Sequence, residues 1–118
     1  MTTVERCDVC IAGAGIAGLK ALFTTAQYLS PGQRVILLDR RQRAGGMWVD
    51  TYDYVRLHQP YPMFTAGNIP WNIGKERSYL ATKPEILAHF RRCLEILRQK
   101  VTLLEYYGYE YITHREGT

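Results

Sequence analysis

Several features that would assign this chain to a common protein class are absent from its sequence. No apolar stretch approaches the roughly 18 residues of a membrane-spanning helix. The charged start, with Glu5 and Asp8, does not resemble a secretory signal peptide. We therefore expect a cytoplasmic protein with no membrane partner. The chain also has no internal repeat and no low-complexity segment.

Cysteine and histidine are scarce, with three of each. His58, His89 and His114 lie far apart and lack the spacing of metal ligands, so we predict no metal site. Cys7 and Cys10 form a CxxC motif, but no second ligand pair follows it. Both fall on a predicted strand, where residues three apart point to opposite faces. We expect them to be buried apolar residues rather than a redox or zinc site.

The charge balance is only mildly basic, with a formal net charge of +4 from 15 basic and 11 acidic residues. The basic residues gather at positions 40–43 and 91–100 and form no long stripe. This pattern argues against a nucleic-acid partner. A chain of 118 residues that is 47% hydrophobic is sufficient for one modest core, which indicates a single domain.

The most informative feature present is a glycine-rich turn near the N-terminus. Residues 7–12 form an apolar run typical of a buried parallel strand, and Gly13, Gly15 and Gly18 follow it at GxGxxG spacing. A second apolar run ends at Asp39, 21 residues after Gly18. A strand, a glycine turn, a helix and an acidic strand end in this order form the dinucleotide-binding fingerprint.

Each part of this fingerprint has a physical purpose. Gly13 permits a sharp turn, Gly15 allows the backbone to approach a pyrophosphate, and Gly18 allows the helix to pack tightly on the strand. The helix N-terminus offers free N–H groups to phosphate oxygens. Asp39 would accept hydrogen bonds from ribose hydroxyl groups.

The remaining periodicity predicts a right-handed βαβαβ unit with a parallel sheet. Helices are expected at residues 16–29 and 82–99, and further strands at 34–38 and 101–104. Thr82 can cap the second helix, with Pro84 in its first turn and Glu85 completing a capping box. Residues 106–113 could extend the last strand or begin an antiparallel meander.

A long loop at residues 40–80 is rich in proline, glycine and aromatic residues. Its aromatic residues are Trp48, Tyr52, Tyr54, Tyr61, Phe64 and Trp71. A disordered linker would not be so aromatic, so we expect an ordered loop. It would either face a ligand or cover one face of the sheet.

A second glycine motif, Gly45-Gly46-Met47-Trp48, follows Asp39 within this loop. With the first turn and Asp39, it resembles the N-terminal FAD-binding segment of class B flavoprotein monooxygenases and related FAD-dependent oxidoreductases. Residues 54–60 also resemble a segment of one subgroup. The resemblance covers about residues 7–106 and implies a partial Rossmann-like domain. Family members commonly have glutamate where this chain has Asp39.

The resemblance also implies cofactor-binding roles for particular residues. Pyrophosphate contacts would come from the first turn: Gly13, Ala14, Gly15, Ile16, Ala17 and Gly18. Ribose contacts would come from Asp39 and Arg40. Flavin contacts would come from Gly45, Gly46, Met47 and Trp48, with His58 and Gln59 on the loop that passes the isoalloxazine. The family uses FAD reduced by NADPH to oxygenate a small organic substrate, and requires no catalytic acid or base in this segment.

No second GxGxxG follows residue 18, so the NADPH site that the family implies is absent from this chain. We expect a truncated piece of a longer protein, which alone would bind FAD weakly or not at all. The strand at residues 7–12 would lie at a sheet edge. Such an edge would favour self-association or pairing with a missing C-terminal portion.

Other functions remain open. The chain could be a small, non-catalytic module for NAD or another adenine nucleotide. A preference for NADP is disfavoured because Asp39 would repel a 2′-phosphate, although Arg40 and Arg41 would partly offset that repulsion. A third possibility is a ligand-free interaction fragment that uses the exposed strand edge.

Overall fold

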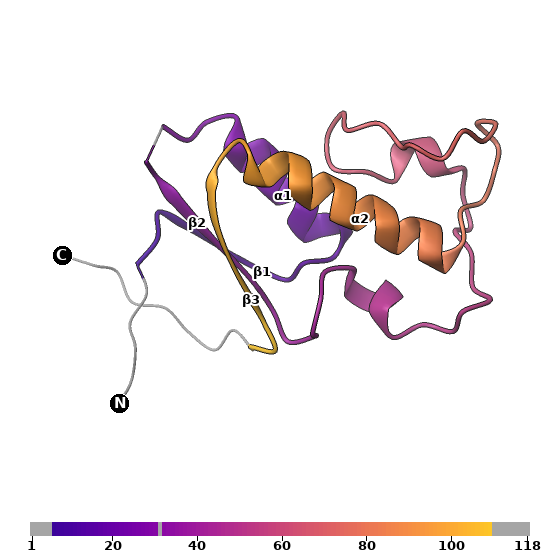
Figure 1. Ribbon diagram of the computed structural model, residues 1–118, viewed down its shortest axis with the longest axis horizontal. Coiled ribbons are helices and arrows are strands. Elements are labelled where there is room, and N and C mark those ends of the chain that lie inside the picture. Colours follow the sequence, from indigo (N-terminus) through magenta and orange to yellow (C-terminus); the bar gives the residue numbers. More distant parts are fainter. Residues whose placement is uncertain (1–5, 31, 110–118) are drawn as a thin grey trace.

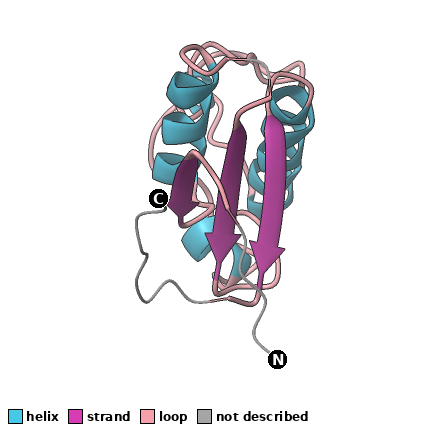
Figure 2. Ribbon diagram, turned by 90° about the vertical axis from the view of Figure 1, so that its left-hand side faces the viewer, coloured by secondary structure: helices cyan, strands magenta, loops and turns pink. Residues whose placement is uncertain are grey.

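The computed structural model describes residues 6–30 and 32–109. Its sheet has three parallel strands, which point the same way in Figure 2: β1 (Val9–Ala12), β2 (Arg34–Asp39) and β3 (Thr102–Tyr107). Two helices connect them, α1 (Ile16–Ala26) and α2 (Lys83–Arg98). Two short 3-10 helices, η1 (Gly46–Val49) and η2 (Tyr61–Met63), lie in the long loop. The predicted βαβαβ fold is confirmed.

The strand order is β1-β2-β3, so β2 is central and β1 lies at an edge. Val9 pairs with Val35, and Arg34 pairs with Thr102, which sets the register of the two ladders. In the part of the chain that the structure describes, no strand pairs with the outer side of β1. The expected edge position of the first strand is confirmed.

Element ends differ modestly from the expectation. The helix α1 ends at Ala26 because the N–H groups of Gln27 and Tyr28 bond to carbonyls three residues back. The strand β3 continues to Tyr107 because it pairs along the whole of β2. The predicted capping box is present: the Thr82 N–H donates to Glu85 Oε1 at 2.9 Å. Of the predicted tail element, residues 110–113 lie outside the described residues.

The two helices pack side by side against each other (Figure 1). They share one core with the strand residues that point toward them. Its fully buried members include Leu19 and Leu22 of α1, Val35 and Leu37 of β2, and Ile86, Leu94 and Leu97 of α2. This core holds the ends of β1 and β2 at fixed positions.

The expectation that Cys7 and Cys10 are buried is wrong, because both are exposed. Cys7 lies before β1. Within β1, Cys10 points away from the buried Ile11, and alternate residues of a strand face opposite sides. The helices contribute their apolar side chains to only one of those sides, and β1 also lies at the edge.

The aromatic loop packs on α2. Phe64 makes an edge-to-face contact with Phe90, with ring centroids 6.1 Å apart. The Trp71 ring stacks on His89 at 4.1 Å, and its indole N–H donates to the Phe64 carbonyl at 2.9 Å. The loop is therefore held by a helix rather than laid over the sheet.

A buried polar cluster underlies this contact. Thr65 Oγ1 lies 2.6 Å from His89 Nε2 and donates to the Ile69 carbonyl at 2.7 Å. The single hydroxyl hydrogen of Thr65 is already donated to Ile69. His89 Nε2 must therefore carry a proton and donate it to Thr65 Oγ1. The other ring nitrogen, Nδ1, has no partner among the described residues. Protonating Nδ1 would bury an unpaired N–H, so the cluster favours neutral imidazole.

This cluster predicts acid sensitivity. Burial, assisted by the charge of Arg92, lowers the pKa of His89 from 6.5 to about 4. An unfolded chain takes up this proton near pH 6.5, so the free energy of unfolding should fall by up to about 3 kcal/mol between pH 6.5 and 4. Urea denaturation across this range measures the loss. His89→Gln should flatten the slope, whereas the exposed His58→Gln should not; equal slopes for all three proteins would contradict the assignment.

Gly18 generates a second prediction. A methyl group at this position would collide with the Gly13 carbonyl oxygen. Gly18→Ala should therefore destabilise the chain by about 1–3 kcal/mol, although alanine is the better helix former. Urea denaturation followed by circular dichroism measures this. The exposed Ala21→Gly in the same helix is the control and should lose about 1 kcal/mol. A more stable Gly18→Ala would refute the close packing.

Candidate functional site

The two glycine motifs, about 30 residues apart in sequence, meet in space. The Gly45 N–H donates to the Ala14 carbonyl at 2.9 Å. A Cβ placed on Gly15 would lie 3.3 Å from the Gly46 Cα, and one placed on Gly46 would lie 2.9 Å from the Gly15 Cα. The two backbones are thus packed against each other: a side chain at Gly46 would collide with Gly15, and one at Gly15 would displace Gly46 by a few tenths of an ångström.

The helix α1 begins at this contact. Its N-cap is Gly15, which offers no side-chain hydrogen bond, and its first turn contains no acidic residue. The first backbone N–H groups of a helix have no intrahelical acceptor. The positive end of α1 is therefore available to an anion at the place where the two turns meet. Gly13, with φ of 110°, makes the turn that leads into it.

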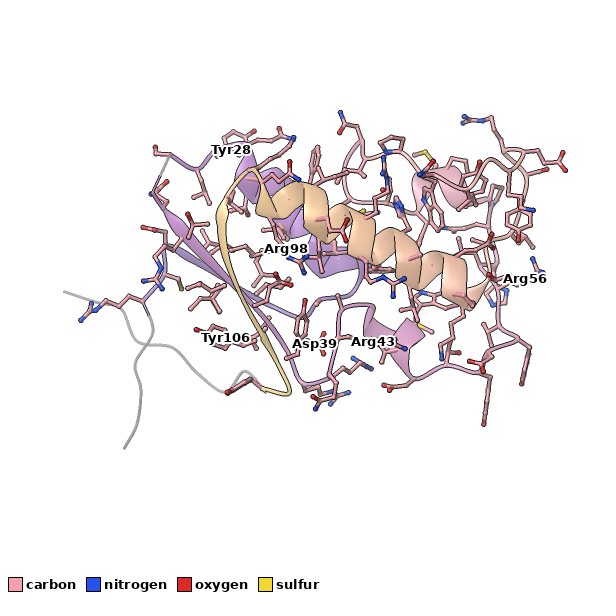
Figure 3. The ribbon with its side chains drawn as sticks, viewed as in Figure 1. Tyr28, Asp39, Arg43, Arg56, Arg98 and Tyr106 are labelled. Atoms are coloured by element: carbon pink, nitrogen blue, oxygen red, sulfur yellow. The ribbon has the colours of Figure 1, made fainter. Side chains whose placement is uncertain are left out.

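Asp39 lies at the end of β2 and is buried (Figure 3). Its Oδ2 accepts the Ala14 N–H at 2.7 Å, and its Oδ1 accepts the Arg41 N–H at 2.8 Å. The Arg41 guanidinium lies 3.9 Å from the same carboxylate. Asp39 therefore ties the end of β2 to the first glycine turn. Arg40, beside it, is exposed.

The end of β3 lies beside Asp39. The Gly108 N–H donates to the Asp39 carbonyl at 2.8 Å. Nearby, the Arg98 guanidinium makes two hydrogen bonds to Glu105, which also accepts the Tyr107 hydroxyl at 2.7 Å. The hydrogen bonds from Arg98 lower the pKa of Glu105, and burial raises the pKa of Tyr107. The strand end next to Asp39 is thus anchored to α2.

The second glycine turn continues into η1. Met47 is 64% exposed, whereas Trp48 is buried and contacts Phe64 edge to face at 6.3 Å. The Trp48 ring therefore belongs to the core in this structure. The flavin contacts expected of these two residues stay predictions.

His58 and Gln59 lie apart from the two glycine turns. Both are exposed, and among the described residues neither makes a hydrogen bond or ion pair with those turns. Gln59 lines a shallow pocket of about 550 Å³, to which no glycine-turn residue contributes. The other lining residues are Pro60, Pro62, Met63, Arg77 and Ser78. The structure thus brings together the first turn, Asp39 and the second turn, but not the 58–59 segment.

Apart from its position at the start of α2, nothing in the sequence indicates that Lys83 contributes to this region. The Lys83 ammonium reaches the backbone just after the second turn and bonds to the carbonyls of Val49 and Thr51. Its neighbour Leu87 packs beneath Gly45. Long-range contacts to backbone carbonyls leave no pattern in a sequence, because every residue type offers the same acceptor.

Residues 6–30 and 32–109 contain neither a metal-binding cluster nor a membrane-spanning helix. No three or more histidine, cysteine or acidic side chains gather as a metal ion would require. No helix there has the length and apolar character needed to cross a membrane.

No family model matches the chain. Its relatives include the uncharacterised protein Rv2000 of Mycobacterium tuberculosis, which is 35% identical over an alignment of 103 residues; the match covers 79% of this chain and 18% of Rv2000. The putative FAD-containing monooxygenase MymA of the same species is 41% identical over 64 residues, covering 53% of this chain and 12% of MymA. The chain thus spans less than a fifth of the length of these curated relatives.

Solved structures show the same fold. A flavin-containing monooxygenase from Stenotrophomonas maltophilia superposes with a TM-score of 0.68 at 20% identity, covering 86% of this chain and 28% of that one. A steroid monooxygenase bound to NADP superposes with a TM-score of 0.59 at 29% identity, covering 82% of this chain and 19% of that one. In sequence and in fold, this chain resembles part of the flavin-containing monooxygenases and related FAD-binding oxidoreductases.

Proposed function

We propose that this chain is the FAD-binding portion of a flavin-dependent monooxygenase. The observation that carries the proposal is the backbone contact between Gly15 and Gly46 at the uncapped start of α1. At this place two glycine backbones lie beside a helix N-terminus, with no side chain between them and a ligand. This arrangement suits a pyrophosphate, whose oxygens need N–H donors at close range. The name of MymA, a putative FAD-containing monooxygenase, supports FAD rather than another dinucleotide.

The residues present fit this cofactor. The pyrophosphate would be held by the first turn and the start of α1, through Gly13, Ala14, Gly15, Ile16, Ala17 and Gly18. Asp39 and Arg40 would bind the ribose. Gly45, Gly46, Met47 and Trp48 would lie toward the flavin, with His58 and Gln59 farther along the loop. When bound, FAD supplies the redox chemistry, and the protein residues orient it and limit its contact with water.

Asp39 would have two functions in this arrangement. Its two oxygens already hold the N–H groups of Ala14 and Arg41. An ionised carboxylate has about four lone-pair positions, so it can accept a ribose hydroxyl in addition. The negative charge would disfavour a 2′-phosphate, consistent with FAD rather than NADP at this turn.

The activity of the complete protein also belongs to this proposal. It would use NADPH as reductant and a small organic substrate, and both sites would lie outside this chain. This chain would form the N-terminal part of a larger FAD-binding domain. Among residues 6–30 and 32–109 no strand pairs with the outer side of β1, and this supports the proposal because such an edge is suited to accept another strand.

The sequence left open weak binding of FAD or none. Because the two glycine turns and Asp39 are held together in the folded chain, the proposal predicts weak, saturable binding of FAD to the purified chain, measured from the flavin absorbance band. Gly15→Ala should lower the affinity about tenfold, because its methyl group would force Gly46 away. Gly74→Asn is the control. An added Cβ at Gly74 would meet nothing within 4 Å, and asparagine tolerates the positive φ of this position. Absence of FAD binding, or equal affinity for Gly15→Ala and the unaltered chain, would contradict the proposal.

A further inference from the structure

Lys83 is placed unusually for a cation. It is the first residue of α2, where the positive end of the helix dipole disfavours a positive charge. Its side chain is only 12% exposed. A cation at this end of a helix that is also largely withdrawn from water needs a compensating interaction elsewhere.

The compensation comes from the loop that begins at the second glycine turn. The Lys83 Nζ lies 2.6 Å from the Thr51 carbonyl oxygen and 3.3 Å from that of Val49. Asp53 Oδ1, at 3.5 Å, completes three oxygens for the three N–H donors of the ammonium. Since the Asp53 side chain is 97% exposed, its ion pair adds little, and the two carbonyls provide the main attachment.

These carbonyls belong to the same short segment as Gly46. The helix η1 starts at Gly46, and the N–H groups of Asp50 and Thr51 bond back to the Met47 carbonyl. The segment is therefore one hydrogen-bonded unit. One end touches Gly15 and the other is attached to Lys83.

A second contact from α2 supports the same unit. A Cβ placed on Gly45 would lie 2.6 Å from the Leu87 side chain, one turn after Lys83. The first two turns of α2 thus contact the segment near both of its ends. Leu87 packs against Gly45, and Lys83 binds the carbonyls of Val49 and Thr51. Among the described residues, Lys83 makes no hydrogen bond or ion pair with α1 or Asp39, so its direct contacts lie on the flavin side of the site.

We propose that Lys83 is a positioning residue for FAD: it touches no cofactor, but it fixes the Gly45–Trp48 turn against Gly15. The inference rests on the proposed function. Without Lys83, the far end of the segment would keep only the exposed ion pair between Asp50 and Arg41, and the flavin half of the cofactor would bind less tightly. The ADP half, held by α1 and Asp39, would be unaffected.

The test compares two ligands on Lys83→Met, which keeps the length and removes the charge. Fluorescence and absorbance titrations give dissociation constants for FAD and for ADP. We expect FAD affinity to fall about tenfold and ADP affinity to change less than about twofold. Lys100→Met, at an exposed lysine, should leave both constants unchanged. Unchanged ADP binding also shows that the variant is folded.

The outcomes separate the two proposals. If the unaltered chain binds neither ligand, the proposed function fails and this inference fails with it. If the unaltered chain binds both and Lys83→Met retains its FAD affinity, only the positioning role is overturned. An equal loss of FAD and ADP affinity would also overturn it, because it would indicate general destabilisation.

Discussion

The close packing of two backbone segments at Gly15 and Gly46 is the constraint on which the rest of the site depends. A side chain on either residue would push the segments apart. With glycine at both, the start of α1 and the start of η1 lie together, and the first N–H groups of α1, which have no intrahelical acceptor, face no capping side chain. Such an arrangement suits phosphate oxygens, which require several donors at short range.

Two charged side chains hold this contact from opposite sides. Asp39 attaches the first turn to the end of β2 through the Ala14 N–H. Lys83 attaches the second turn to α2 through the carbonyls of Val49 and Thr51. Each charge is satisfied by backbone groups rather than by an opposite charge alone, so the turns depend on fixed elements on both sides. The core between sheet and helices keeps these elements at a constant separation.

Much of this arrangement could be predicted from the sequence, because local patterns determine it. The glycine spacing and the apolar runs identified β1, α1 and β2, and Thr82 with Glu85 located the start of α2. Long-range features could not be read in the same way. The exposure of Cys10 follows from the edge position of β1 together with the side on which the helices pack. Neither the burial of Trp48 nor the reach of Lys83 has a local signature, since both depend on where the loop returns to α2.

The central claim is that the two glycine turns form one cofactor site, and residue-resolved mapping tests it most directly. Amide chemical shifts of the isotopically labelled chain would be recorded during addition of FAD. The account predicts that the largest changes occur together at Ile16 and Ala17 in α1 and at Gly46 and Met47 in the second turn. Changes confined to the separate pocket around Met63 and Arg77, or to the first turn alone, would contradict it.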